Sequence, residues 1–407
     1  MSDEKTAGNG PARVSAEVAA LDAGYVLSTY ARQPLELVAG QGSEVVGADG
    51  RRYLDMVLGL SVSNFGHCHP RVVEAVRDQV GRLIHCSNLY YTAPQARLAE
   101  RLSKLTNGGK VFFGNSGAEA NEAAIKIARK HAQPSGGGAI VTLERSFHGR
   151  TMATLHATGQ PEKHLPFVPG VPGYLHVPVG DVVALRAVFA ERRVAAFMAE
   201  PVLGESGVRL VPADYLREAQ RLCVEHDALF MLDEVQTGLG RCGAPFAYHR
   251  LGLEPDVVTV AKTLGGGLPI GAAIVGGRAE GVFGPGDHGS TFGGGPVVAA
   301  AALAVLDLLD EPGLFDRIEE RGARLEQWLE RLLAAGVATE VRRLGLMAAV
   351  DLAAGNAKAV VAGALDAGIL LNATSDETIR LLPSLLVTDA DIDRVGGFLC
   401  DFLAVGR

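Results

Sequence analysis

Two ionisable residues stand at the carboxyl ends of short apolar runs, a placement typical of a catalytic crevice. Residues 229–232 lead into Asp233, and residues 257–261 lead into Lys262. Both runs are short, apolar and bounded by turn residues, so we expect buried parallel strands. Ligands of open α/β sheets bind beyond the carboxyl ends of the strands, so the acid and the amine should face one crevice.

An amine and a carboxylate in one crevice could hold pyridoxal phosphate (PLP). A lysine amine forms a Schiff base with a carbonyl, which is how this cofactor is bound. An acid that pairs with the protonated pyridine nitrogen makes the ring an electron sink. The simpler alternative, in which Asp233 caps a loop and Lys262 is solvated, stays open on these two residues alone.

A phosphate site is suggested by the stretch VFFGNSGAEANEAAIKIARKHA at residues 111–132. A strand leads through a glycine turn into a helix, and Ser116 and Glu119 have capping-box spacing. The free N–H groups and the positive dipole end of such a helix favour an anion. Ser116, Gly117 and Ala118 therefore suit a phosphate, although an ordinary capped helix explains the motif alone.

Further candidate side chains follow other expected strands. The stretch ERSFHGRT supplies Phe147, His148 and Arg150. An aromatic ring can stack on a flat ligand, and an arginine can hold a carboxylate with two hydrogen bonds. Glu205 follows another strand, and Arg380 lies in the apolar strand TIRLLP, where a charge needs a partner or a ligand.

Two glycine-rich stretches differ in what they predict. The loop HGSTFGGGP, residues 288–296, could bring Thr291 close to a phosphate or simply make a tight turn. The letters from Gly238 to Gly243 match G-x-G-x-x-G, but no helix start follows, so we discount a dinucleotide site. A nicotinamide-dependent oxidoreductase would rest on that match alone.

Composition and charge exclude several classes of protein. The 407 residues are 48% hydrophobic, and the net charge of -8 argues against a nucleic-acid binder. No apolar run approaches the roughly 20 residues of a membrane span. The five cysteines are scattered, and the adjacent His67, Cys68 and His69 rarely converge on one ion, so we expect no metal site. Reduced thiols and the lack of a signal peptide predict a soluble, cytoplasmic protein.

The expected elements form a large α/β domain and a smaller α+β domain. Residues 1–15 are predicted to be a flexible tail, residues 16–60 to pack with the small domain, residues 61–310 to form the PLP-binding domain, and residues 311–407 to form the small domain.

Two further segments carry apolar side chains. Pro70 opens a helix with Val73, Val76, Val80 and Leu83 on one face. The loop SNLYYT holds two tyrosines, Tyr90 and Tyr91, which we expect to pack beneath the loop rather than to form a ligand wall.

Together the motifs resemble the class III (ornithine-type) PLP-dependent aminotransferases of fold type I. The matching stretches span about residues 50–390 in the family's order: GHCHP, SNLYYT, NSGAEANEAAIKIARK, SFHGRT, ATGQP, LDEVQTGLGR, AKTLGGGLPIGA and HGSTFGG. The resemblance implies a large, mostly parallel-sheet α/β domain with a smaller α+β domain.

The resemblance also implies the residues that bind PLP. Lys262 resembles the Schiff-base lysine and Asp233 the partner of the pyridinium nitrogen, with Gln236 beside the ring hydroxyl. The other implied cofactor contacts are Ser116, Gly117, Ala118, Phe147, His148 and Thr291. Thr291 would reach the phosphate from the other subunit, so the resemblance implies a homodimer with shared active sites.

For the substrates, Arg150 resembles the arginine that binds the α-carboxylate of an ornithine-type donor. Arg380 resembles the arginine that binds 2-oxoglutarate, and Glu205 would pair with it while the diamino substrate is bound. Ser290 is also implied at the substrate site. Leu60 stands where enzymes that use free ornithine carry a tyrosine, which favours an acylated α-amine.

The implied reaction transfers the distal amine of N2-acetyl-L-ornithine to 2-oxoglutarate by a ping-pong mechanism, as in arginine biosynthesis. The products would be N-acetylglutamate 5-semialdehyde and glutamate. Departures from the family pattern at Leu203, Ser206 and Gly295 bear on the donor. N-succinyldiaminopimelate, carrier-linked lysine, ornithine and 4-aminobutyrate are therefore alternative donors, whereas a non-catalytic protein would not need both Lys262 and Asp233.

Overall fold

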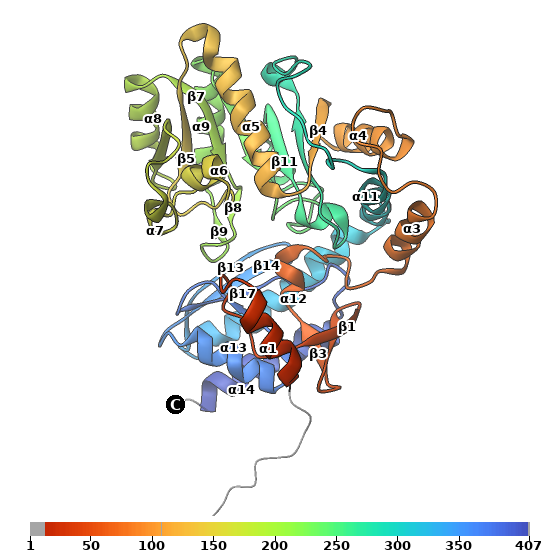
Figure 1. The fold of residues 1–407 in the computed structure, drawn as a ribbon. Helices are drawn as coiled ribbons and strands as arrows, with labels where there is room; N and C mark the ends of the chain where they lie inside the picture. The colour runs from red at the N-terminus through yellow and green to blue at the C-terminus, as the bar shows by residue number, and fades with distance from the viewer. Residues whose placement is uncertain (1–12, 107, 406–407) are drawn as a thin grey trace, which may run out of the picture.

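The computed structural model describes residues 13–106 and 108–405, and its elements form two lobes (Figure 1). The first lobe, here the sheet lobe, is built on a seven-stranded sheet. In sheet order its strands are β4 (Lys110–Gly114), β12 (Gly271–Val275), β11 (Val257–Val260), β10 (Leu229–Asp233), β7 (Val194–Ala199), β5 (Ala139–Leu143) and β6 (Tyr174–Val177). Only β12 runs antiparallel to its neighbours, so the expected mostly parallel sheet is confirmed.

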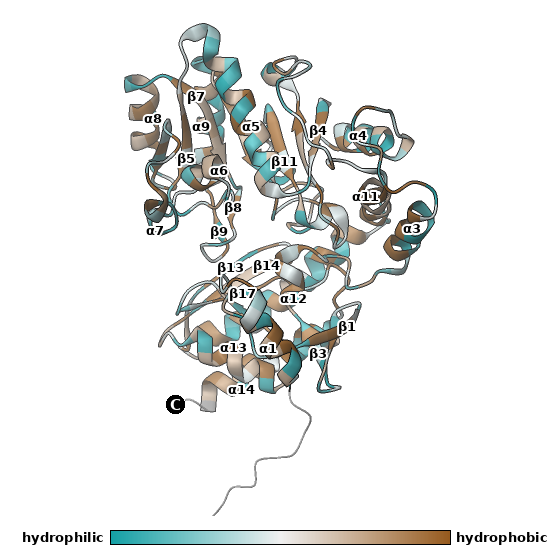
Figure 2. Ribbon diagram, viewed as in Figure 1, coloured by the Kyte–Doolittle hydropathy of each residue, from teal (hydrophilic) through white to brown (hydrophobic). Residues whose placement is uncertain are grey.

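Both faces of this sheet are covered, which explains why its strands read as continuous apolar runs. In β10, Leu229 and Met231 pack with α5 (Gly117–Ala132) on one face. Phe230 and the residues in phase with it pack on the other face with α9 (Ala213–Glu225). Figure 2 shows β11 as strongly hydrophobic between these layers. The remaining large helices of the lobe are α3 (Pro70–Val80), α4 (Ala93–Leu105), α8 (Val182–Glu191) and α11 (Pro296–Leu309).

The second lobe, here the small lobe, combines both ends of the chain. One sheet has the order β13-β14-β17-β16, and the other has the order β1-β2-β3-β15. Because β3 pairs in parallel with β15, the N-terminal strands lie beside C-terminal elements (Figure 1). The domain boundaries themselves stay a prediction. Residues 1–12 of the expected tail lie outside the described residues.

The elements of the small lobe follow the expected order with one addition. A strand that the sequence did not reveal, β13, precedes the expected one, β14, and pairs with it. The strands are β1 (Leu37–Gln41), β2 (Glu44–Gly47), β3 (Arg52–Asp55), β13 (Ala338–Leu344), β14 (Met347–Leu352), β15 (Ile369–Leu370), β16 (Asn372–Ala373) and β17 (Thr378–Leu381). The helices are α1 (Ala16–Tyr25), α2 (Leu58–Ser61), α12 (Leu314–Ala334), α13 (Ala357–Asp366) and α14 (Asp389–Val405).

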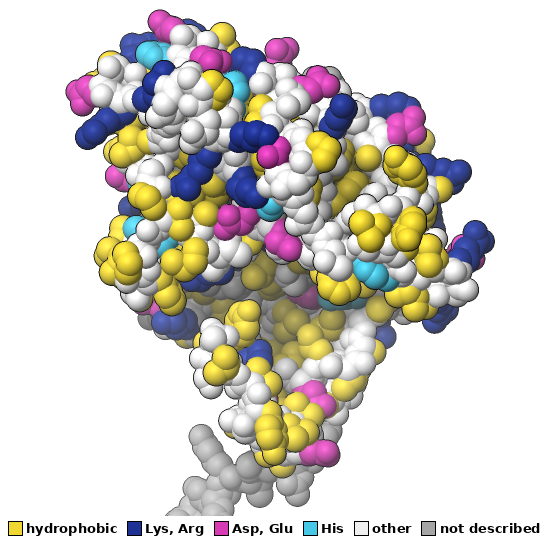
Figure 3. Space-filling model, turned by 45° about the horizontal axis from the view of Figure 1, so that its top comes forward, with side chains coloured by type: hydrophobic (Ala, Val, Ile, Leu, Met, Phe, Trp, Pro, Cys, Tyr) yellow, Lys and Arg dark blue, Asp and Glu magenta, His cyan; other side chains and the backbone are white. Residues whose placement is uncertain are grey.

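For the single chain, one packing expectation is correct in part and the other is wrong. On the apolar face that follows Pro70, Val73 and Val76 are half-buried, whereas Val80 and Leu83 are exposed. Tyr90 is 71% exposed and Tyr91 is fully exposed, so neither packs beneath its loop. Figure 3 shows exposed apolar side chains along the recess between the lobes and on the projecting lower part.

Two further surveys cover the same described part of the chain. No helix within residues 13–106 or 108–405 is long and apolar enough to cross a membrane. Within those ranges, no group of three or more His, Cys, Asp or Glu side chains is arranged to hold a metal ion.

Candidate active site

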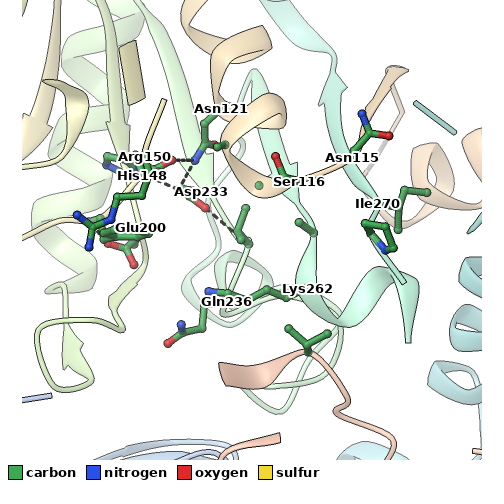
Figure 4. Close-up of a pocket in the computed structure, with 18 of the residues that line it drawn as sticks. Asn115, Ser116, Asn121, His148, Arg150, Glu200, Asp233, Gln236, Lys262 and Ile270 are labelled. Atoms are coloured by element: carbon green, nitrogen blue, oxygen red, sulfur yellow. Dashed lines mark hydrogen bonds and ion pairs between the residues drawn. The ribbon is translucent and has the colours of Figure 1, made fainter. Parts of the chain in front are cut away.

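A cavity of about 460 Å³ lies beyond the carboxyl ends of β10 and β11, where the sheet lobe faces the small lobe. The two strands are parallel neighbours, with Asp233 opposite Thr259. Asp233 and Lys262 therefore reach the same cavity, as expected from the two apolar runs. Figure 4 shows Lys262, Gln236 and Asp233 around one space, with Ser116 at the start of α5 beside it.

Asp233 is buried and held by several donors. Its Oδ2 accepts hydrogen bonds from Asn121 Nδ2 at 2.7 Å and from His148 Nδ1 at 2.8 Å. The amide N–H of Val235 donates to Oδ1 at 3.0 Å. The Nε2 atom of His148 is buried and has no partner among the described residues. These donors fix the carboxylate at the cavity, where it could pair with a cationic group on a ligand.

The amine of Lys262 faces Asp233 across the cavity from an unusual backbone conformation. Its φ angle is +42°, in the left-handed region that residues other than glycine rarely adopt. Burial lowers the pKa of Lys262, and Arg380 adds to this effect, while Glu205, Asp233 and Glu200 oppose it. A lowered pKa increases the fraction of neutral amine, which is the form that attacks a carbonyl.

The N-terminus of α5 lines the cavity with Gly117 and Ala118. Ser116 caps the helix, since its Oγ accepts from Glu119 N at 3.1 Å. The first N–H groups of a helix have no partner within it, and they carry the positive end of its dipole. Gly117 is packed tightly, because an added Cβ would lie 2.7 Å from a methyl carbon of Val235. The strand–turn–helix stretch therefore places a positively polarised helix end at the cavity, where an anion could bind.

Phe147 lies on the cavity wall with cations close to its ring. The guanidinium carbon of Arg150 is 5.5 Å from the ring centroid, and Lys163 Nζ is 5.9 Å from it. The backbone N–H of Phe147 donates to Glu200 Oε2 at 2.8 Å. Burial raises the pKa of Glu200 to about 7.

Arg380 does not line the cavity itself but contacts residues that do. It is 2% exposed, and its Nη1 donates to Gly204 O at 2.9 Å and to Glu205 Oε1 at 3.3 Å. The same nitrogen lies 3.4 Å from Gln236 Oε1, while Nη2 donates to Asn372 Oδ1 at 2.8 Å. Glu205 and Gln236 themselves line the cavity.

The remaining sequence-predicted residues lie outside the cavity lining of this chain. Ser290 Oγ accepts from Asn115 Nδ2 at 3.3 Å, while Thr291 is exposed on the following turn. Leu60 is 39% exposed, and Val62 forms the cavity wall in that segment. The substrate roles of Leu60 and Ser290 stay predictions.

Sequence reasoning missed Asn121, which connects several parts of the site. Its Nδ2 also donates to His148 O at 2.8 Å, and its Oδ1 accepts from Thr259 Oγ1 at 2.6 Å. A signal was present, because Asn121 lies in the buried stripe of α5 with Ala124 and Ile125. A polar residue in such a stripe needs a hydrogen-bond partner.

Comparison with known proteins assigns the family. A model described as Aminotransferase class-III matches residues 27–403, so the chain belongs to the class-III aminotransferases. An acetylornithine aminotransferase of Caldanaerobacter subterraneus subsp. tengcongensis is 44% identical over 384 residues, which are 93% of this chain and 97% of that protein.

Solved structures agree with the family. The crystal structure of an ornithine aminotransferase from Toxoplasma gondii has a TM-score of 0.91 at 32% identity, covering 96% of this chain and 95% of that one. An acetylornithine aminotransferase from Elizabethkingia anophelis has a TM-score of 0.85 at 32% identity, covering 95% and 99%. These likenesses confirm the fold type I architecture, and the enzyme is a PLP-dependent transaminase.

The cavity fits this cofactor on its own chemistry. It offers an amine without a hydrogen-bond partner among the described residues, a buried carboxylate opposite that amine, and a helix N-terminus shaped by a glycine. These groups match the aldehyde, the pyridine nitrogen and the phosphate of PLP.

Proposed function

We propose that this enzyme transfers the distal amino group of N2-acetyl-L-ornithine to 2-oxoglutarate. The products are N-acetylglutamate 5-semialdehyde and glutamate. The observation that carries the proposal is the placement of Lys262, Asp233 and the Glu205–Arg380 pair around one cavity. The donor is supported by curated relatives named acetylornithine aminotransferase, at 44% identity over 93% of this chain for one and 47% over 90% for another.

The cofactor supplies a carbonyl that carries the amino group and a ring that delocalises the electrons of the reacting carbon. Gly117 and Ala118 would hold its phosphate through backbone N–H groups, with Ser116 beside them. Asp233 would keep a proton on the ring nitrogen, and Phe147 would cover the ring face. Gln236, supported by Arg380, would contact the ring hydroxyl, and His148 would orient Asp233.

Lys262 Nζ would bind the cofactor carbonyl and, once a substrate amine has displaced it, move a proton at the reacting carbon. Its lowered pKa favours both tasks, since each requires a neutral amine. Glu200 would position Phe147 through the hydrogen bond to its backbone N–H.

The two substrates would use different cations of the same cavity. Arg150 would bind the α-carboxylate of the donor, which directs the distal amine towards Lys262. Arg380 would bind the α-carboxylate of 2-oxoglutarate after Glu205 releases it. Ornithine itself is the second candidate donor, because a structural neighbour is an ornithine aminotransferase. The apolar Leu60 disfavours it, since leucine offers no partner to a free ammonium group.

A homodimer is proposed from the exposed surface around Thr291. Asn88 Nδ2 donates to Ser290 O at 2.8 Å, and the rings of His85 and Phe292 are 5.1 Å apart. These contacts tie the 83–92 loop to the Thr291 turn. Large apolar side chains are exposed on both segments: Leu83, Ile84, Leu89, Tyr90, Tyr91 and Phe292. Such a patch favours association, and Thr291 on it would reach the cavity of a second subunit.

The cytoplasm is the proposed compartment. All five cysteines are free thiols, which is typical of proteins in a reducing environment.

A visible spectrum with one substrate tests the function. The purified protein loaded with PLP should be yellow, and N-acetylornithine without any keto acid should bleach the band. A band that bleaches with ornithine but not with N-acetylornithine would overturn the donor. A protein that stays colourless after incubation with PLP would overturn the assigned role of Lys262.

A further inference from the structure

Arg241 is fully buried, and among the described residues no carboxylate lies within ion-pair distance of its guanidinium. Its guanidinium is instead surrounded by neutral acceptors. Nε donates to Ser61 Oγ at 3.0 Å, Nη1 to Leu346 O at 2.8 Å and Pro383 O at 2.7 Å, and Nη2 to Asn64 Oδ1. A buried cation without a counter-charge is costly, so its retention calls for a role beyond packing.

Except for Leu346, which precedes β14 in the small lobe, each acceptor of Arg241 lies on a segment that adjoins a residue of the active site. Ser61 precedes Val62, which lines the cavity. Pro383 follows the strand that carries Arg380. Arg241 itself lies on the stretch that continues from Asp233.

Arg241 is also linked to the segment that carries Lys262, through Asn64. Asn64 Nδ2 donates to Thr263 Oγ1 at 2.5 Å, and Thr263 Oγ1 donates to Ser61 O at 3.2 Å. Thr263 directly follows Lys262. One guanidinium therefore reaches the Lys262 segment through a single side chain.

The segments that Arg241 joins have strained backbones. Leu58, Leu60 and Ser61 have φ angles of +48°, +63° and +69°, and Lys262 has +42°. Such conformations are energetically costly and persist only where surrounding contacts fix them. Arg241 fits this task because its planar group donates in several fixed directions, whereas a lysine ammonium is a point donor.

We propose that Arg241 is a positioning residue for transamination: its guanidinium fixes the Lys262 segment, the Val62 segment and the small lobe relative to one another, and so holds the lysine amine in its cavity. The inference rests on the proposed role of Lys262. Loss of Arg241 should loosen the small lobe, which carries Arg380, and admit water around the amine, while the charged groups of the sheet lobe that face it, Glu205, Asp233 and Glu200, stay in place.

The test measures the reactivity of Lys262 in the enzyme without PLP. The rate at which acetic anhydride acylates this lysine is followed by peptide mass spectrometry as a function of pH, in the wild type, Arg241→Met and Thr263→Val. Both variants should move the midpoint to higher pH, Arg241→Met by about one pH unit, because water restores the ordinary pKa of an amine. Thr263→Val leaves every direct contact of Arg241 in place and removes only the hydroxyl that links Asn64 to the Lys262 segment. It therefore tests the proposal if Arg241→Met does not fold.

Arg324→Met is the matched control. It removes an arginine held by Asp393 in the small lobe, away from the cavity. It should lower thermal stability without moving the Lys262 midpoint. Midpoints that coincide with the wild type in both Arg241→Met and Thr263→Val would overturn the proposal, as would an equal shift in Arg324→Met. Added PLP should protect Lys262 from acylation in the wild type, and failure of this protection would instead overturn the proposed role of Lys262.

Discussion

Arg380 and Glu205 form an ion pair of 3.3 Å in which the two partners are held very unequally. The arginine is buried and also donates to Gly204 O and Asn372 Oδ1. The Glu205 side chain is 31% exposed, and Arg380 is its only hydrogen-bond partner among the described residues. Although burial opposes ionisation of Glu205, Arg380 and Lys262 keep its pKa below the ordinary value. The carboxylate is therefore the partner that can move away while the arginine stays in place.

Glu205→Gln should weaken the preference for the diamino donor. A neutral amide leaves Arg380 open to α-carboxylates throughout the cycle, so glutamate competes better as a donor. A hydrogen bond to a charged group contributes roughly 1.5–3 kcal/mol, which predicts that the ratio of kcat/KM for N-acetylornithine over glutamate falls about 10-fold or more. Glu162→Gln, at an exposed site on the short helix Pro161–His164, is the control. An unchanged ratio would remove Glu205 from this role.

Arg150→Ala should raise KM for donors that carry an α-carboxylate by roughly 10- to 100-fold, since a paired charged hydrogen bond is lost. Simple diamines lack that carboxylate and should be little affected. Lys163→Ala is a matched control, because Lys163 lies at a similar distance from the Phe147 ring. An equal rise in KM for both donor types, or in both Arg150→Ala and Lys163→Ala, would show that only the positive charge near the Phe147 ring matters.

Lys262→Ala and Thr291→Asp should each be inactive alone but should restore activity when coexpressed. If Thr291 acts across a dimer interface, each hybrid dimer has one site with an intact Lys262 and an intact Thr291. Random assembly then predicts about a quarter of the wild-type activity, because half of the dimers are hybrids with one good site each. No restoration, despite hybrid dimers seen by native mass spectrometry, would place Thr291 in the site of its own chain.

Glu234→Gln should increase stability at alkaline pH. Burial raises the pKa of Glu234 to about 7, above its ordinary 4.5. Between these values the unfolded chain loses the proton first, so this group lowers the free energy of unfolding as pH rises. The glutamine can still accept from Tyr248 N and face the hydroxyl of Thr237. The variant should gain up to about 3 kcal/mol at pH 8 and little at pH 5, as measured by urea unfolding.

Glu218→Gln is the control for the Glu234→Gln measurement, because it also replaces a carboxylate with an amide. Hydrogen bonds from Arg221 and Arg186 lower the pKa of Glu218 to about 2. Its stabilising contribution is complete above pH 4.5 and disappears only towards pH 2, so the substitution should cost the same at pH 5 and pH 8. A gain for Glu234→Gln that does not depend on pH would show that ionisation of Glu234 is not its cause.

The predicted elements of the site were largely correct where the signal is local. The strands that end at Asp233 and Lys262, and the capped helix from Gly117, match the structure closely. Strand length, helix period and cap residues are properties of neighbouring residues, so a single sequence contains them. The surface was predicted less well: Val80 and Tyr91 are exposed here, because apolar pattern alone does not distinguish a core face from an exposed patch.

The sequence by itself determined that an amine, an acid and a helix N-terminus meet at the edge of one sheet, because parallel strands present their carboxyl ends on the same side. Tertiary structure alone decided which distant side chains complete that site. Asn121 reaches Asp233 and Arg241 reaches Ser61 across long stretches of chain. These contacts depend on sheet order and on how the lobes pack, and neither property is written in any local pattern.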